Sequence, residues 1–498
     1  MKNSRSPPAL AARIGSGILL LHGSQIAHLS PLLLLRLINT AKVRLHTTVI
    51  GRHYMTHLTE TMSGESGSDT LHIAIIGAGI GGLALAIGLS NQNVSFTLYE
   101  SAAQFSAVGA GVGLGPNALR AMELIDQRFR QMYNQISSGN LTPNKEHIAM
   151  EVLYAEDGFG ETRGWQAAPF GADCYTRTSA HRRDLLDIMT SLIPKERVKF
   201  NKRAKEIKQT TENSKVIVTF EDGEAIEADA VIGCDGVKSA TRQAVLEALY
   251  PDQVKAKFSG KYAYRSIVPM KDAQEILGVH AGDAKAFIGH GVNIMTYPIS
   301  RGTELNVVAT KLTDKPWTHP QWTNEVTKED IVADFAGVAD QRIVRLLDWA
   351  KPVQWSLWHH PSTPTYYNER ICLLGDSAHA TTPHQASGAG QCLEDALLMS
   401  HILGLAKDSS EIPTAFQVYD GIRRPRAQAI VTTSQDCGKL YTFTHPELAT
   451  DMSKIVANLN QRFLWIWEHD LSMDMEIARS QFAALTQNAE CNPEHSRL

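Results

Sequence analysis

Three glycines with the spacing G-x-G-x-x-G, followed by an acidic residue, form the first pattern that could bind a ligand. Gly77 allows a tight turn after a strand, Gly79 leaves room for a pyrophosphate, and Gly82 lets the next helix pack closely on that strand. Glu100 follows Gly82 by 18 residues, where a carboxylate can accept hydrogen bonds from ribose hydroxyls. We predict a cofactor that contains ADP; the alternative is a turn of this type that only serves packing.

A second loop of small residues lies much further along the chain, at residues 375–391. It follows an apolar run and precedes a predicted helix, so the backbone N–H groups at Gly388 and Ala389 could stabilise negative charge on a reduced flavin ring. Asp376 could accept a hydrogen bond from a ribitol hydroxyl, or it could simply cap a helix. Because two distant loops can share one site only around a long cofactor, this pattern favours FAD.

Two further candidates lie between these loops. The glycine-rich segment 104–120 contains Gly111 and Gly113, where the backbone could approach a flat ring or a phosphate closely. The alternative is a flexible turn before a helix. Arg182 stands at the start of a helix expected at residues 181–192, where it could reach a cofactor phosphate. The alternative for Arg182 is a solvated side chain in the first helical turn.

The segments around these loops predict an α/β protein. Apolar runs at 73–76, 95–99, 230–234 and 371–374 indicate buried parallel strands. A further strand is expected at 173–178. The glycine pattern therefore lies where a parallel strand of the predicted sheet turns into a helix.

A different pattern begins near residue 257. The runs 262–268, 286–288, 292–297 and 305–310 indicate antiparallel strands of a separate sheet. One face of this sheet could line a pocket, although ordinary core packing explains any single aromatic residue equally well. The side chains that suggest a pocket are Tyr262, Tyr264, Arg265, His290, Met295 and Tyr297.

These patterns divide the chain into four parts. Residues 1–70 form an N-terminal leader or extension that we expect to be disordered. Residues 71–256 form the first part of the cofactor domain, and residues 257–370 form an inserted substrate domain. Residues 371–490 complete the cofactor domain and add C-terminal helices.

Composition excludes several classes of function. The 498 residues carry a net charge of −4, so nothing points to a nucleic-acid partner. The six cysteines are scattered without a CxxC pair, which argues against a disulfide framework and against a zinc site. We therefore expect no bound metal and a reducing compartment.

The N-terminal segment has a composition of its own. Seven Lys or Arg residues and no acidic residue precede Glu60. Apolar runs at 18–21 and 32–35 are each too short to cross a bilayer, so we expect no stable membrane span. The simplest prediction is a cytoplasmic protein, with a mitochondrial transit peptide at residues 1–60 as the alternative.

Three motifs give the chain a resemblance to a known family. They are GAGIGG together with Glu100, GCDG at 233–236, and GDSAHATTPHQASGAGQCLEDA at 375–396. In order and spacing they resemble the FAD-dependent aromatic hydroxylases, which are single-component flavoprotein monooxygenases. Residues 465–470, WIWEHD, are similar to the salicylate hydroxylase-like fungal branch.

The resemblance implies a Rossmann-like FAD-binding domain with an inserted antiparallel-sheet substrate domain and C-terminal helices. It also implies roles for individual cofactor residues. Glu100 would bind the adenosine ribose, while Gly113 and Arg182 would contact FAD. Asp376 and Ala389 would hold the ribitol and the flavin.

The same resemblance implies hydroxylation of a small phenolic or aromatic acid with NAD(P)H and O2, with or without loss of CO2. His384 would act as an acid/base or orient the substrate, unless it is buried core like His379. Arg265 would pair with a substrate carboxylate or phenolate, with Tyr262 and Tyr264 as alternatives. We expect a monomer or a homodimer.

Other activities stay open at this point. Within the flavoenzymes, the alternative is an oxidase or a Baeyer–Villiger-type monooxygenase of secondary metabolism. An NAD-dependent dehydrogenase and a non-catalytic Rossmann-type binding protein are the rivals from other classes. Yellow colour, substrate-stimulated NAD(P)H oxidation and an oxygenated product would distinguish these functions.

Overall fold

The computed structural model describes residues 10–14, 17–21, 71–105, 111–210 and 214–491. The chain divides into two compact units, residues 1–69 and 70–498.

In the first unit, β1 (Leu10–Ile14) pairs antiparallel with β2 (Gly17–Leu21). Two short strands thus lie within the N-terminal segment for which disorder was predicted. For the remainder of the N-terminal extension, the prediction lies outside the described residues.

The cofactor domain is built on a six-stranded sheet whose central strands are parallel. Burial on both faces explains why its strands are continuous apolar runs, as in Ile73–Ile76. In spatial order the strands are β20 (Tyr367–Asn368), β21 (Ile371–Leu373), β13 (Ala230–Gly233), β3 (His72–Ile76), β4 (Ser95–Tyr99) and β9 (Val198–Lys199).

Helices from both halves of the chain cover this sheet. Helix α4 (Ile80–Asn91) is apolar around its circumference and packs against α13 (Gly388–Leu403), which also contacts α5 (Pro116–Ile125). Nearby elements are α6 (Gln127–Ile136), α7 (Arg182–Ser191), α8 (Ala240–Leu246), the strand pair β5 (Gly111–Gly113) and β8 (Ser179–His181), and the three-stranded sheet of β10 (Ala204–Gln209), β11 (Val216–Phe220) and β12 (Ala225–Ala228).

The second large sheet has eight strands. In spatial order they are β18 (Thr323–Glu325), β19 (Val353–His359), β14 (Lys257–Pro269), β17 (Glu304–Leu312), β16 (Val292–Ile299), β15 (Lys285–Gly289), β6 (Ile148–Tyr154) and β7 (Ala168–Gly171). All neighbours are antiparallel except β15 and β6. Strands β6 and β7 join this sheet although they precede the boundary predicted at residue 257.

One predicted strand is wrong. Residues 173–178 form turns and irregular backbone between β7 and β8. The segment contains tyrosine and two threonines, which favour strands, but it pairs with no neighbouring strand along its length, and strand assignment depends on that pairing.

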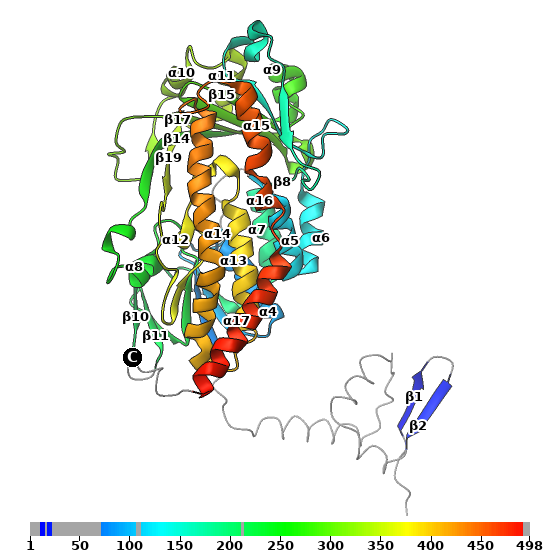
Figure 1. Cartoon of the computed structure of the whole chain (residues 1–498), viewed down its shortest axis with the longest axis vertical. Helices are drawn as coiled ribbons and strands as arrows, with labels where there is room; N and C mark the ends of the chain where they lie inside the picture. The colour runs from blue at the N-terminus through cyan, green and yellow to red at the C-terminus, as the bar shows by residue number, and fades with distance from the viewer. Residues whose placement is uncertain (1–9, 15–16, 22–70, 106–110, 211–213, 492–498) are drawn as a thin grey trace, which may run out of the picture. The chain divides into compact units, whose positions relative to one another are not determined.

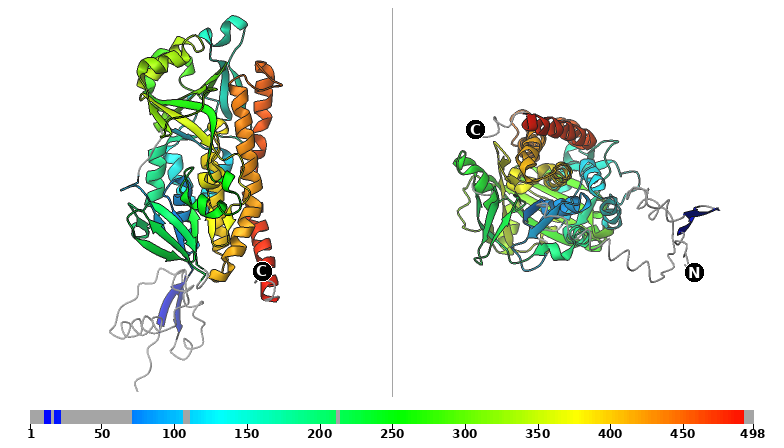
Figure 2. Two further views of the ribbon diagram at one scale, coloured as in Figure 1. Left: turned by 90° about the vertical axis from the view of Figure 1, so that its left-hand side faces the viewer. Right: turned by 90° about the horizontal axis from the view of Figure 1, so that it is seen from below.

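The eight-stranded sheet packs on helices at both faces. Helices α9 (Met270–Leu277), α10 (Lys328–Phe335) and α11 (Gln341–Leu346) cover one face of the sheet. On the other face, hydrophobic residues of β6 and β15 pack with those of the C-terminal helices α14 (Ile412–Tyr441), α15 (Met452–Arg462) and α16 (Leu464–Trp467). Helix α14 runs lengthwise beside both large sheets (Figures 1 and 2), and α16 is followed by α17 (Leu471–Cys491).

Candidate active site

The glycine turn after β3 has the geometry that its spacing predicts. Gly77 has φ of +100°, and a Cβ there would lie 2.5 Å from the carbonyl oxygen of Cys234. A Cβ at Gly82 would lie 2.0 Å from the carbonyl oxygen of Gly77, so only glycine fits the helix–strand contact. A Cβ at Gly79, in contrast, would meet no atom within 4 Å. The structure therefore leaves open space beside Gly79, where a ligand can approach.

Glu100 directly follows β4, and its carboxylate holds the same turn by hydrogen bonds. Its Oε2 accepts a hydrogen bond from the backbone N–H of Ala78 at 2.8 Å, and its Oε1 accepts one from Ala102 at 2.7 Å. The side chain is only partly buried. This position beside the glycine turn is the one predicted for a ribose contact, and the carboxylate already organises the turn.

The second loop lies next to the first. Gly375, with φ of +70°, lies two residues after the end of β21, and α12 (Asp376–His379) begins directly after Gly375. A Cβ at Gly81 in the first turn of α4 would lie 2.8 Å from Cδ2 of Leu374. Because β3, β13 and β21 are parallel neighbours, their carboxyl ends lie at one edge of the sheet. The expectation that both turns meet at one groove is confirmed.

A cavity of about 470 Å³ connects the two turns with the eight-stranded sheet. Nine of the residues predicted as site residues line it. They are Gly79, Gly111, Gly113, Arg182, Arg265, Asp376, His384, Gly388 and Ala389. Gly77, Gly82 and Glu100 support the first turn behind this lining.

The cavity presents donors that fit an anionic dinucleotide. Helices α4 and α13 both begin in its wall, and no side chain caps either N-terminus. Unpaired N–H groups at a helix start favour phosphate or other negative charge. Nε of Arg182, and Nε and Nη2 of Arg177, are buried without a hydrogen-bond partner among the described residues. Arg177, which also lines the cavity, follows no motif and was missed by the sequence analysis.

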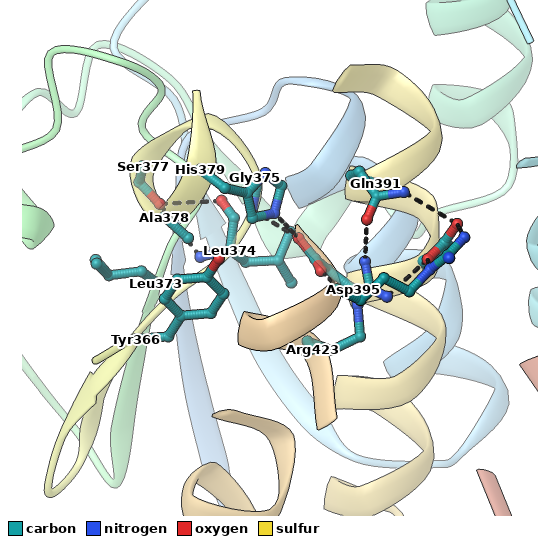
Figure 3. A network of polar contacts seen from close by, with 12 residues as sticks. Tyr366, Leu373, Leu374, Gly375, Ser377, Ala378, His379, Gln391, Asp395 and Arg423 are labelled. Atoms are coloured by element: carbon teal, nitrogen blue, oxygen red, sulfur yellow. Dashed lines mark hydrogen bonds and ion pairs between the residues drawn. The ribbon is translucent and has the colours of Figure 1, made fainter. Parts of the chain in front are cut away.

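A buried polar network holds the second loop in place (Figure 3). Oδ2 of Asp395 accepts a hydrogen bond from the backbone N–H of Gly375 at 3.0 Å and lies 2.5 Å from Nε2 of His379. Arg423 on α14 donates to Asp395 at 2.8 Å and to Glu394 at 2.6 Å. The prediction that His379 is a hydrogen-bonded core residue fits this position. These contacts connect the turn at Gly375 with helices α12, α13 and α14 at the start of the cofactor loop.

The opposite wall of the cavity is one face of the eight-stranded sheet. Side chains of a strand alternate between the two faces, and register places residues of neighbouring strands in rows. Two such rows line the cavity. They are Ala263–Thr310–Asn293 and Arg265–Val308–Met295.

Arg265 is the cationic member of these rows. Its guanidinium carbon lies 5.3 Å from the ring centroid of Trp355. Burial lowers its pKa from the ordinary value, and the neighbouring Arg182 acts in the same direction while Tyr297 opposes it. No carboxylate forms an ion pair with Arg265 within the described part of the chain. The side chain is thus positioned to meet an anionic group inside the cavity.

Tyr262 and Tyr264 lie on the other face of the same strand. Both hydroxyls donate to Oδ2 of Asp334, at 2.8 and 2.6 Å, and neither residue lines the cavity. Burial, followed by these bonds to Asp334, raises the pKa of both phenols above its ordinary value. The prediction that they contact substrate is wrong, because even- and odd-numbered residues of β14 point in opposite directions. Arg265 and the tyrosines cannot share a face.

His384 lies in the short helix Pro383–Gln385 and is buried at the cavity wall. Its Nε2 is 3.3 Å from Nζ of Lys261, which the sequence analysis missed. The alternation that places Arg265 on the cavity face also places Lys261 on it, and this was the available signal. Burial lowers the pKa of His384 well below its ordinary value, and the charge of Lys261 acts in the same direction.

Comparison with known proteins identifies the family of this chain. Residues 70–434 match the protein family described as FAD binding domain. A protein of Gibberella moniliformis named FAD-dependent monooxygenase is 41% identical over 429 residues, which cover 83% of this chain and 97% of that protein. The chain belongs to the FAD-dependent monooxygenases. Its cofactor is FAD, as the paired loops predicted.

Two further relatives narrow the type of monooxygenase. The 6-methylsalicylate 1-monooxygenase atA of Aspergillus terreus is 34% identical, with coverage of 84% of this chain and 94% of the relative. A solved structure described as a salicylate hydroxylase substrate complex superposes with a TM-score of 0.72 at 30% identity, covering 83% of this chain and 98% of that chain. This monooxygenase is therefore an FAD-dependent aromatic hydroxylase of the salicylate hydroxylase type, with NAD(P)H as co-substrate.

Within residues 71–105, 111–210 and 214–491, no cluster of three or more His, Cys, Asp or Glu side chains could hold a metal ion. None of the helices in the described residues is both long and apolar enough to cross a membrane.

Proposed function

We propose that this monooxygenase hydroxylates a phenolic acid that carries a carboxylate next to its hydroxyl group, as salicylate does. The observation that carries the proposal is that Arg265 and His384 line the same cavity as the two cofactor turns. A cation and an imidazole in one cavity are suited to a substrate with one carboxylate and one phenol. The names of the Aspergillus terreus relative and of the solved salicylate hydroxylase complex support this substrate class.

FAD, when bound, supplies electron transfer from NAD(P)H and activation of O2 for attack on an aromatic ring. We assign the ADP end to the first turn, with Gly79 at the pyrophosphate and Glu100 at the ribose. Arg182 lies in the wall where it can pair with a phosphate. Asp376 would accept a hydrogen bond from the ribitol, and the N–H groups at Gly388 and Ala389 would face the flavin ring.

Arg265 would bind the substrate carboxylate. A guanidinium matches a carboxylate with two parallel hydrogen bonds, and charge-assisted bonds of this kind are stronger than neutral ones. Arg265 pairs in register with Val308, and its guanidinium carbon lies 5.3 Å from the ring centroid of Trp355, so the substrate ring would be oriented as well as bound. Apolar neighbours such as Met295 would exclude water around the ring.

His384 would take part in ionising the substrate phenol. A phenolate is richer in electrons than a phenol, so ionisation favours attack by an electrophilic oxygen. The ring nitrogen Nδ1 of His384 has no hydrogen-bond partner among the described residues, while Nε2 contacts Lys261. Nδ1 would thus be the atom that meets the substrate.

Loss of CO2 belongs to the same proposal. If oxygen is placed on the ring carbon that bears the carboxylate, the bond to that carboxylate breaks and a catechol remains. The relative named 6-methylsalicylate 1-monooxygenase supports this outcome for a related protein.

The test is a panel of phenolic acids given to the purified yellow holoenzyme. We expect salicylate-class compounds to stimulate NAD(P)H oxidation, and mass spectrometry to find one oxygen atom from ¹⁸O2 in the product. Benzoate and phenol, which each lack one of the two groups, serve as matched control compounds. NAD(P)H oxidation without oxygen incorporation would identify an oxidase, and an ester or lactone product would identify a Baeyer–Villiger reaction. Either result would contradict the proposal.

A further inference from the structure

Lys261 is buried without a counter-ion. The residue is 6% exposed, and its ammonium group forms no ion pair with a carboxylate within the described part of the chain. An unpaired ammonium in such a place is costly, so burial favours the neutral amine. The other deeply buried lysine of this sheet, Lys285, differs because it is paired with Glu151.

The neighbours of Lys261 come from two elements. His384 of the short helix Pro383–Gln385 is within hydrogen-bond distance, and α14 presents the thiol of Cys437 and the ammonium group of Lys439. Burial lowers the pKa of Lys261 to about 8, the Cys437 thiol opposes this, and Lys439 adds to it. Both protonation states of Lys261 are accordingly accessible near neutral pH.

Gly438 makes room for the pair. A Cβ at this position of α14 would lie 2.2 Å from Cδ2 of His384 and 2.5 Å from Nζ of Lys261. The helix backbone therefore packs directly against both side chains. In this packing the amine lies beside Nε2 of His384, and Nδ1 of His384 has no hydrogen-bond partner among the described residues.

We propose that Lys261 and His384 form a proton relay that removes the phenolic proton of the substrate. This inference rests on the proposed function, because it requires a phenol beside His384. Lys261 has no access to the substrate itself, since it does not line the cavity. It acts through the imidazole and is a positioning and proton-accepting residue behind His384.

The proton transfer balances within the pair. The phenol gives its proton to Nδ1 of His384 and keeps the electron pair of its O–H bond as a phenolate. The proton on Nε2 passes to the neutral amine of Lys261, which becomes an ammonium. His384 is neutral before and after the transfer, so no imidazolium has to form beside a buried cation. The single positive charge that results balances the new phenolate.

The experiment compares Lys261→Met and Lys261→Gln with the wild-type holoenzyme. Methionine is unbranched and only one atom shorter than lysine, and it lacks the polar head group, whereas glutamine can donate a hydrogen bond but cannot take up the proton. Lys311→Met is the matched control, because Lys311 lies on the same sheet and bonds the backbone oxygen of Asp334. Each variant is first checked for bound FAD, and where Lys261→Met does not retain FAD, Lys261→Gln decides the result.

Two measurements are made on each protein. The first uses 5-nitrosalicylate as the probe, whose phenolate absorbs more strongly in the visible range than its phenol. The apparent pKa of the bound phenol should rise by at least about one unit in both Lys261 variants, with hydroxylation slowed by about 10²-fold or more and KM little changed. The second follows the ring ¹⁵N signals of His384 without substrate, which should respond to a titration near pH 8 only when Lys261 is present.

The outcomes separate the two proposals. If Lys261→Gln showed the phenol pKa and the hydroxylation rate of the wild type, Lys261 would serve only to hold the imidazole ring of His384. This result would overturn the relay. An absent ¹⁵N response in the wild type would also overturn it, even if the enzyme hydroxylates salicylates. A clear ¹⁵N response in an enzyme that hydroxylates no phenolic acid would support the coupling of the pair and contradict the proposed function alone.

Discussion

Nε2 of His379 lies 2.5 Å from Oδ2 of Asp395, and both side chains are fully buried. This contact connects the turn after β21 with α13, and Arg423 extends it to α14. Figure 3 shows these side chains converging beneath the turn that begins at Gly375. The cofactor loop is therefore held by a polar network inside the core, away from the cavity that it lines.

Removing one partner of this network should destabilise the fold. Asp395→Asn leaves the buried guanidinium of Arg423 without part of its counter-charge, and breaking a buried pair in this way costs about 3–5 kcal/mol. Urea denaturation should show the loss, together with weaker retention of FAD. Arg163→Gln breaks an exposed ion pair with Glu156 and is the control, for which we expect an unchanged midpoint. Equal stability of wild type and Asp395→Asn would contradict this role for the network.

Acid should release the same interaction. Burial alone would raise the pKa of Glu394 and Asp395. Arg423 and Arg426 beside Glu394, and His379 and Arg423 beside Asp395, outweigh burial and lower both pKa values to about 2. A carboxyl group whose folded pKa is depressed stabilises the fold above its unfolded pKa. This stabilisation is complete above about pH 5 and is lost as pH falls from about 4.5 toward 2. Urea midpoints measured across this range should decline, and Asp395→Asn should show a shallower decline.

Gly438 and Gly421 give a matched pair of substitutions in α14. Gly438→Ala places a methyl group 2.2 Å from His384, whereas a methyl group at Gly421 meets no atom within 4 Å. We expect Gly438→Ala to displace the imidazole and slow hydroxylation about 10²-fold while FAD stays bound. Gly421→Ala should leave the rate unchanged and stabilise the helix by up to about 1 kcal/mol. Stopped-flow rates and thermal unfolding measure both effects, and equal rates in the two variants would remove His384 from the chemistry.

Arg265 and Tyr264 are neighbours in sequence that should behave differently. Arg265→Gln removes a charge-assisted bond worth about 1.5–3 kcal/mol, so KM for a phenolic acid should rise at least about tenfold. Tyr264→Phe removes a hydroxyl that points to Asp334 on the other face, and KM should not change. Steady-state kinetics with salicylate tests the pair. A larger effect on KM from Tyr264→Phe than from Arg265→Gln would reverse the assignment of the two faces.

The sequence could predict the cofactor loops because their constraints are local. Gly77 needs a positive φ, Gly82 must let a helix approach, and the apolar run before them is typical of a buried strand. Parallel strands bring their carboxyl ends to one edge, so the turns that contain Gly77 and Asp376 lie at the same edge although they are far apart along the chain. These features follow from residue type and spacing.

The substrate side could not be predicted in the same way. The choice between Arg265 and its tyrosine neighbours depends on which face of β14 is turned to the cavity, and that is decided by packing against other elements. Strand β6 enters the second sheet by pairing with β15, a long-range contact without a local signal. Arg177 likewise reaches the cavity only through the folded chain.

By itself, the sequence determined an FAD-binding protein with two cofactor turns, because backbone conformation and strand burial leave their mark on each short segment. Only the tertiary structure decided which side chains surround the substrate space. Lys261 and His384 are 123 residues apart, and they meet because β14, the short helix Pro383–Gln385 and α14 pack around Gly438. Contacts of this kind arise from the packing of whole elements, and residue spacing along the chain does not encode them.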